Sequence, residues 1–202
     1  VGSDNISPDV KRYDSQIIKY AGKHGIPEYL SLIRAVMMQE SGGRAVDVMQ
    51  SSECEFNKKY PRRPNGITDT EYSIDVGTQY LAACLKDAEC ESPSDIPKIS
   101  LACQGYNFGR GYISWAVKNY GGYSKANAQV FSDQQKRKSD SSVYGDVDYV
   151  DHVLRYYTIS SSPIGGAIKP ETGGYIWPAP GFSLISSPYG LRLGRLLRGT
   201  YI

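Results

Sequence analysis

The sequence predicts an all-α domain of about seven helices, followed by a linker and a short tail. Two observations lead to this prediction. Apolar residues recur at spacings of three and four in separate segments between residues 12 and 157, and no convincing strand pattern occurs before residue 158. Glycine and proline stand between these segments, as at the joints of helical domains. We therefore expect a helical domain over residues 1–158, a linker over 159–174 and a further fragment over 175–202.

The first two predicted helices lead to a single glutamate. Apolar spacing predicts a first helix over residues 12–23, which ends before Pro27. Pro27 suits the opening turn of the second helix, because its missing N–H has no partner there in any case. That helix ends at Glu40, where Gly42 and Gly43 follow.

Glu40 lies on the apolar face of its helix, because Ile33, Val36 and Met37 precede it by seven, four and three positions. Burial and the negative end of the helix dipole both favour the neutral carboxylic acid, so we expect a raised pKa. A general acid that works near neutral pH needs this property. The alternative at this point is a slightly rotated helix that leaves Glu40 in water.

Residues 44–70 are rich in Asp, Ser, Asn, Gly and Pro, and the segment is longer than an ordinary connection. Long loops in compact domains often carry functional residues, so we expect this loop to belong to a site. Beyond it, the apolar spacing predicts five more helices, with Ser94 as the N-cap of the second of them: 72–85, 99–106, 112–119, 125–137 and 148–157.

The composition excludes several classes of function. A net charge of +2 gives no strong field, which argues against a nucleic-acid binder, and Lys136-Arg137-Lys138 is interpreted as a solvated helix end. No stretch approaches the roughly twenty apolar residues of a membrane span, so any signal or anchor is expected upstream of this sequence. His24 and His152 have no partnering Cys or carboxylate pattern, so we expect no metal and no cofactor.

The four cysteines, Cys54, Cys84, Cys90 and Cys103, have spacings unlike those of a zinc site. An oxidising compartment would allow two disulfides in any of three pairings. Four buried free thiols are the alternative.

Three short segments carry polar residues at helix ends or in the long loop: Glu40-Ser41, Val48-Met49-Gln50 and Gln104-Gly105-Tyr106-Asn107. In that order, and with Tyr149-Val150 and Tyr156 on the last helix, they resemble the glutamate-serine, small-Leu-Met-Gln, Ala-Tyr-Asn and terminal-tyrosine motifs of the lysozyme-like lytic transglycosylase superfamily. The resemblance covers residues 13–157, which look like the lysozyme domain of CwlT-like cell-wall hydrolases of conjugative transposons.

The resemblance implies a lysozyme-like fold around a saccharide cleft. Glu40 would be the catalytic acid that cleaves the bond between N-acetylmuramic acid and N-acetylglucosamine in peptidoglycan. Ser41 would hydrogen-bond near the scissile sugar, and Tyr149 would close over the cleft. The other implied substrate-binding residues are Met49, Gln50, Gln104, Tyr106 and Asn107.

A water-using glycosidase generally needs a second carboxylate. Asp47 stands where the family usually has a small residue, and Glu53 follows in the same loop. The candidates are Asp47, Glu53, Asp69 and Asp75, and capping a turn or facing solvent is the alternative for each. We expect a muramidase. The alternatives are a lytic transglycosylase, which forms 1,6-anhydro-muramic acid with one carboxylate, and a non-catalytic cell-wall binding or assembly module.

The same resemblance implies a setting. The substrate would be peptidoglycan strands in the cell wall, outside the membrane, and the full-length protein would be secreted or membrane-anchored, with the conjugation machinery as a partner. Disulfides persist in that compartment. We then predict Cys54–Cys84, which would pin the loop, and Cys90–Cys103.

The tail has a resemblance of its own. Its Trp-Pro-Ala-Pro and Ser-Ser-Pro-Tyr-Gly-Leu-Arg runs, within residues 175–202, resemble the opening of LytM-type zinc endopeptidase domains. No His follows His152, so a zinc site is not expected in this fragment.

Overall fold

The computed structural model describes residues 5–159, 191–192 and 195–196. The chain divides into two compact units, Val1–Ile164 and Gly165–Ile202. In the first, helices are the only regular secondary structure among the described residues, which confirms the all-α prediction. In the second, β1 (Leu191–Arg192) and β2 (Arg195–Leu196) pair antiparallel. The predicted linker and most of the LytM-like fragment lie outside the described residues.

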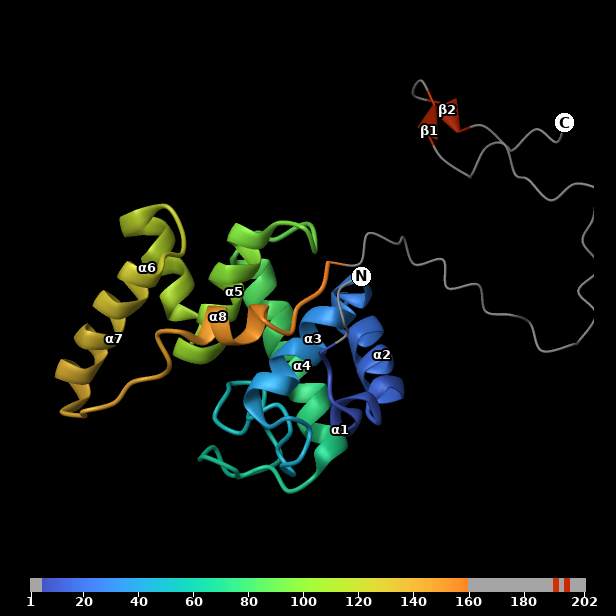
Figure 1. The fold of residues 1–202 in the computed structure, drawn as a ribbon, viewed down its shortest axis with the longest axis horizontal. Coiled ribbons are helices and arrows are strands. Elements are labelled where there is room, and N and C mark those ends of the chain that lie inside the picture. The colour runs from blue at the N-terminus through green and yellow to red at the C-terminus, as the bar shows by residue number, and fades with distance from the viewer. Residues whose placement is uncertain (1–4, 160–190, 193–194, 197–202) are drawn as a thin grey trace, which may run out of the picture. The chain divides into compact units, whose positions relative to one another are not determined.

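The N-terminal helices are α1 (Pro8–Lys11), α2 (Asp14–Lys23) and α3 (Leu30–Glu40), with the 3₁₀ turn η1 (Pro27–Tyr29) before α3. Helix α1, a single turn capped by Ser7, was not predicted from the sequence, so the described part has eight α-helices where about seven were expected. Pro27 begins a 3₁₀ turn that runs into the α-helix. Helix α3 packs against both α1 and α2 (Figure 1).

Helices α4 (Thr70–Asp87) and α5 (Ile96–Phe108) pack against each other in the middle of the domain. Asp69 caps α4 by accepting a hydrogen bond from the Tyr72 N–H. Asp95 caps α5 in the same way, so the prediction of Ser94 as N-cap was wrong by one residue. The Ser94 hydroxyl pairs instead with that of Ser92, at 2.8 Å.

The remaining helices are α6 (Gly111–Tyr120), α7 (Lys125–Ser139) and α8 (Tyr149–Leu154). Ser124 caps α7 as part of a capping box, which fits the predicted start of this helix. Helix α8 is shorter than predicted, and it packs against both α3 and α5 (Figure 1). The last helix therefore returns to the end of α3, where Glu40 lies.

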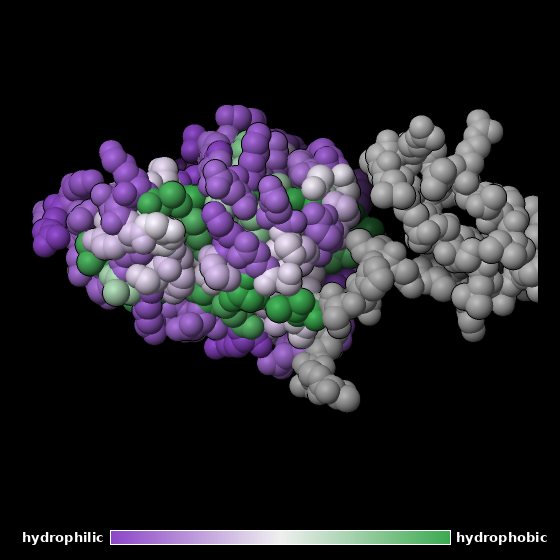
Figure 2. Space-filling model, turned by 90° about the horizontal axis from the view of Figure 1, so that it is seen from above, coloured by the Kyte–Doolittle hydropathy of each residue, from purple (hydrophilic) through white to green (hydrophobic). Residues whose placement is uncertain are grey.

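Residues 41–69 form a loop that packs closely against α4. A Cβ on Gly77 would lie 2.3 Å from the Met49 Cβ, so glycine allows the loop to approach the helix. The surface seen in Figure 2 is mostly hydrophilic, with apolar residues in smaller areas. Among the described residues, no helix combines the length and apolar character needed to cross a bilayer.

All four cysteines are free thiols, so the predicted disulfides Cys54–Cys84 and Cys90–Cys103 are not formed. Cys84 and Cys103 lie in the apolar core, and burial raises the pKa of Cys103 to about 12. The Cys90 thiol donates to the Ser92 carbonyl oxygen at 3.4 Å. Cys54 and Cys90 are only partly buried, so the alternative of four buried free thiols holds for Cys84 and Cys103 alone.

Candidate active site

Glu40 ends α3 and its side chain is partly buried. Burial raises its pKa to about 7, and the negative charges of Asp47 and Asp146 act in the same direction. The Tyr149 hydroxyl donates a hydrogen bond to Oε1, which opposes the shift but does not cancel it. Glu40 is therefore a carboxyl group that holds a proton near neutral pH and gives it up readily.

Tyr149 is the first residue of α8 and is buried, so its hydroxyl reaches Glu40 from the packed interface between α8 and α3. Among the described residues, Oε2 of Glu40 has no hydrogen-bond donor. Within the described part of the chain, hydrogen bonding therefore holds one of the two carboxyl oxygens.

Asp47 is 2% exposed and receives four hydrogen bonds. Its Oδ1 accepts from the Ser51 N–H at 3.1 Å and the Ser73 hydroxyl at 2.6 Å. Its Oδ2 accepts from the N–H and the hydroxyl of Ser52. These donors offset the cost of burying the carboxylate and tie the loop to α4.

Two further contacts tie the loop to itself and to α5. The Ser41 hydroxyl donates to the Val48 carbonyl oxygen at 2.8 Å and accepts from the Gly43 N–H at 3.0 Å. The Met49 carbonyl oxygen accepts from the Tyr106 hydroxyl at 2.7 Å. Ser41 and Tyr106 therefore hold the loop in place, and their predicted contacts with sugar stay predictions.

Gln50 adopts a left-handed backbone conformation with φ of 46°. Its Nε2 donates to the Asp47 carbonyl oxygen at 2.9 Å and to Oδ1 of Asn65 at 3.1 Å. Such a conformation costs free energy in a residue with a side chain, and it often marks a binding site. Its predicted role in substrate binding, like that of the buried Met49, stays a prediction.

Two predicted cleft residues at the end of α5 hold the backbone of Asp146. Gln104 Nε2 donates to the Asp146 carbonyl oxygen at 2.9 Å, and Asn107 Oδ1 accepts from the Asp146 N–H at 2.7 Å. The Oε1 of Gln104 is buried and has no hydrogen-bond partner in the described part of the chain. Asp146, which was not singled out from the sequence, is thus held by two of the predicted cleft residues.

Asp146 carries a histidine partner. Its Oδ2 lies 2.6 Å from Nδ1 of His152, and its Oδ1 accepts from the Asp148 N–H at 2.8 Å. His24 likewise lies 2.6 Å from Asp75, so the prediction that neither histidine has a carboxylate partner was wrong. The available signal for His152 was an aspartate six residues earlier, just before the terminal tyrosine motif.

Glu53, the other predicted second carboxylate, is exposed. Its carbonyl oxygen accepts from Arg62, and its charge is absent from the causes that shift the pKa of Glu40. The structure therefore brings Asp47 and Asp146, but not Glu53, into the electrostatic surroundings of Glu40. Within the described residues, no group of three or more His, Cys, Asp or Glu could hold a metal ion.

A family model described as lysozyme-like matches residues 7–174. The chain belongs to the lysozyme-like family.

Three relatives extend this finding. The bifunctional muramidase/DL-endopeptidase CwlT of Bacillus subtilis is 38% identical, over 88% of this chain and 56% of its own length. A pneumococcal vaccine antigen A homolog of Streptococcus pyogenes is 34% identical, over 55% of this chain and 52% of its own. A Staphylococcus aureus crystal structure, described as similar to lipoprotein of the NLP/P60 family, has a TM-score of 0.64 and 33% identity, covering 77% of this chain and 55% of that one. The chain spans about half the length of these curated relatives.

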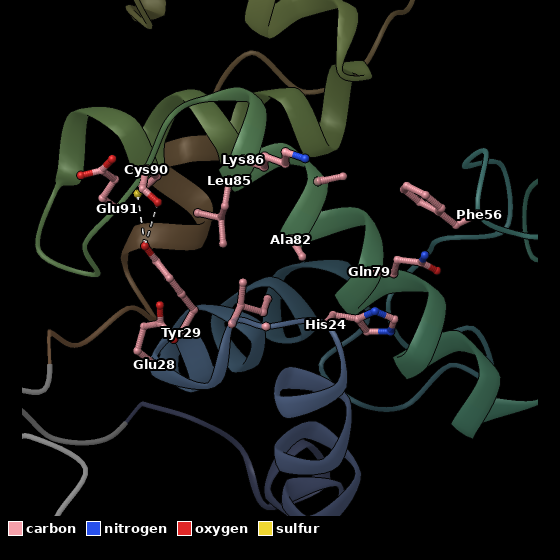
Figure 3. Close-up of a pocket in the computed structure, with 13 residues that line it drawn as sticks. His24, Glu28, Tyr29, Phe56, Gln79, Ala82, Leu85, Lys86, Cys90 and Glu91 are labelled. Atoms are coloured by element: carbon pink, nitrogen blue, oxygen red, sulfur yellow. Dashed lines mark hydrogen bonds between the residues drawn. The ribbon is translucent and has the colours of Figure 1, made fainter.

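A separate cavity of the lysozyme-like domain lies between the end of α2, η1 and α4, with a volume of about 470 Å³. His24, Tyr29, Gln79 and Lys86 are among its lining residues, and Tyr29 donates to the carbonyl oxygen of Cys90 at one end (Figure 3). No residue that hydrogen-bonds Glu40 or Asp146 lines this cavity. This cavity is therefore separate from the candidate active site, which we place at Glu40 because of its raised pKa and its contact with Tyr149.

Proposed function

We propose that this lysozyme-like domain is a peptidoglycan hydrolase, an N-acetylmuramidase with Glu40 as general acid. The observation that carries the proposal is the carboxyl group of Glu40, whose pKa is raised to about 7 and whose Oε1 is held by Tyr149. The relative CwlT of Bacillus subtilis is named a muramidase, which supports the choice of substrate. The proposed bond joins N-acetylmuramic acid to N-acetylglucosamine.

The chemistry follows from the protonation state. At pH 6 to about 7, a large fraction of Glu40 carries a proton, which it donates to the glycosidic oxygen as the bond to the muramic acid carbon breaks. Tyr149 then stabilises the carboxylate that forms, because its hydroxyl already points at Oε1. Ser41, Met49, Gln50, Gln104, Tyr106 and Asn107 are proposed to shape the cleft, in part by holding the loop and the segment before α8.

Lytic transglycosylase activity is the second candidate. The observation in its favour is Asp47, whose four hydrogen bonds leave it poorly suited to activate water. A transglycosylase needs no such base, since the 6-hydroxyl of muramic acid attacks the same carbon.

The proposed place of action is the cell wall, outside the membrane. We also propose a role in opening the wall during conjugative transfer, with the conjugation machinery as partner; this rests on the resemblance to CwlT-like hydrolases of conjugative transposons. Loss of transfer from a donor that carries Glu40→Gln, with the protein still present, would support it. Normal transfer would contradict it.

The test of the enzymatic proposal is Glu40→Gln on purified cell walls. Glutamine has the shape of glutamate but cannot donate the catalytic proton, so clearing of the walls should stop while binding to them persists. Glu89→Gln, at an exposed position on the α4–α5 connection, is the matched control and should clear walls normally. Undiminished clearing by Glu40→Gln would remove Glu40 from the mechanism, and a wild-type protein that binds walls without clearing them would be a binding module.

A further inference from the structure

We propose that Asp146 is the second carboxylate of the site, the general base that takes a proton from the attacking water. The inference rests on the proposed hydrolase function and names the residue that such a hydrolase needs besides Glu40. It replaces Asp47 and Glu53, the two loop candidates among those predicted from the sequence.

The backbone of Asp146 is fixed on both sides by α5. The Asp146 N–H donates to Oδ1 of Asn107 at 2.7 Å, and Nε2 of Gln104 donates to the Asp146 carbonyl oxygen at 2.9 Å. The same carbonyl oxygen accepts from the Tyr149 N–H at 3.3 Å. Asp146 and the tyrosine that contacts Glu40 are therefore positioned as one unit.

Gly145 allows this close approach. It has φ of 55°, and a Cβ there would lie 2.5 Å from the ring of Phe108 and 2.7 Å from Oδ1 of Asn107. A larger residue would displace the segment from the end of α5. The position of Asp146 is thus specified by packing as well as by hydrogen bonds.

The carboxylate of Asp146 is held by hydrogen bonds but can still accept more of them. Each carboxylate oxygen has one partner, Asp148 N–H at Oδ1 and His152 Nδ1 at Oδ2, so each keeps a lone pair. The side chain is 33% exposed and can be reached by water. Nδ1 of His152 lies 2.6 Å from Oδ2 and fixes the orientation of the carboxyl group.

Asp146 is also close enough to act on Glu40, because its negative charge raises the pKa of Glu40. The groups around the acid are Asp47 from the loop, Tyr106 from α5, and Asp146 and Tyr149 from the segment leading into α8. Two carboxyl groups with different surroundings divide the roles of acid and base. Glu40, the more buried group, is proposed as the acid, and Asp146, hydrogen-bonded and accessible to water, as the base.

The proposed step balances. The water oxygen bonds to C1 of N-acetylmuramic acid while one water proton passes to Asp146. The bond from C1 to the glycosidic oxygen breaks, and Glu40 gives its proton to that oxygen, which stays with N-acetylglucosamine. Asp146 then returns a proton to Glu40 through solvent. A single displacement of this kind inverts the configuration at C1.

The test is Asp146→Ala on purified peptidoglycan, with and without sodium azide. Removal of a general base should lower kcat about 10²- to 10⁴-fold. Azide is a nucleophile that needs no base, so it should restore cleavage and give a glycosyl azide of inverted configuration, identified by mass spectrometry and NMR. Asp151→Asn, an exposed aspartate of α8, is the matched control and should keep its rate.

Three results decide the matter. A rate for Asp146→Ala within about threefold of wild type, well short of a base's effect, would overturn the proposal. So would a lost rate that azide does not restore in a folded protein, since that result indicates a structural role. If Asp146→Ala does not fold, Asp146→Asn, which keeps an acceptor for the Asp148 N–H, takes its place with the same outcomes. Anhydro products from the wild type would instead refute the hydrolase function on which the inference rests.

Discussion

Two segments bring a carboxylate towards Glu40, and they treat it in opposite ways. The loop after α3 buries Asp47 and surrounds it with four donors, whereas the segment before α8 fixes the backbone of Asp146 and leaves its side chain accessible. Both charges raise the pKa of Glu40. The difference teaches that the partners of a carboxylate, more than its proximity to the acid along the sequence, determine what it can do.

The two segments also depend on different parts of the domain. Asp47 is held by serines of its own loop and by Ser73 of α4, so it organises the site locally. Asp146 is held by two amides from the end of α5. The comparison predicts that Asp47 contributes mainly to stability and Asp146 mainly to rate.

The largest expected effect is a loss of kcat in an Asp146 variant whose free energy of unfolding hardly changes. Asp146→Asn should lower kcat about 10²- to 10⁴-fold and change the free energy of unfolding by less than about 1 kcal/mol, because its acceptor for the Asp148 N–H remains. Muropeptide release and urea unfolding measure the two quantities on one sample. A stability loss as large as that of the Asp47 variant would break the comparison.

Asp47→Asn should destabilise the domain by about 2–4 kcal/mol, because an amide NH₂ would face two hydrogen-bond donors in a buried site. Urea unfolding measures the change. Asp69→Asn is the control, since asparagine also caps a helix well and should cost less than about 0.5 kcal/mol. An Asp47 variant as stable as this control would contradict a structural role.

Glu40→Gln should stabilise the domain above pH 7. The pKa of Glu40 is about 7 in the folded state against a model value of 4.5, so its ionisation costs stability progressively as pH rises through this window. At about 1.4 kcal/mol per pKa unit, the full cost is about 3 kcal/mol, and it vanishes below pH 4.5, where both states are protonated. Urea unfolding at pH 4 and pH 8 checks the sign, and equal stability at pH 8 would contradict the raised pKa.

Asn107→Ala should lower kcat by about tenfold, because it frees the backbone N–H of Asp146 and loosens the base without removing it. Asn107→Asp keeps an acceptor at that position and should recover part of the rate. Asn119→Ala, at an exposed position in α6, is the control. Steady-state kinetics on soluble glycan strands measure these rates, and a rise in KM with unchanged kcat would indicate a sugar contact instead.

The smallest expected effect is on the pKa of Glu40 itself, by about one unit or less. Tyr149→Phe removes a donor to the carboxylate and should raise this pKa, while Asp146→Asn removes a neighbouring charge and should lower it. Carboxyl ¹³C NMR titration of labelled Glu40 reports both shifts. Shifts of the same sign would contradict the electrostatic account.

The helical domain and the buried position of Glu40 at a helix end, with its raised pKa, are predicted from the sequence because both depend on local patterns. Apolar spacing identifies α3, and the following glycines locate its end, so Glu40 is found without tertiary information. Asp146 has no such signal, since its role arises from Gln104 and Asn107, which are 42 and 39 residues away. Spacing alone likewise gives no indication that Cys54 and Cys84, or Cys90 and Cys103, remain unpaired.

The resemblance to known motifs points to segments that meet around Glu40, but it does not predict the contacts of each residue. Gln104, Tyr106 and Asn107 were expected to line the cleft. A polar group of each instead hydrogen-bonds the backbone of another segment of the domain. These contacts depend on how α5, the loop and α8 meet, which no local pattern encodes. Sugar contacts for these residues stay predictions.

The measurement that tests the central claim most directly is the mass of muropeptides released from purified walls in H₂¹⁸O. A hydrolase with Glu40 as acid and water as nucleophile predicts reducing muramic acid ends that carry one ¹⁸O atom, and none from Glu40→Gln. Products lighter by one water, with anhydro ends and no label, would contradict hydrolysis and assign the domain to the lytic transglycosylases.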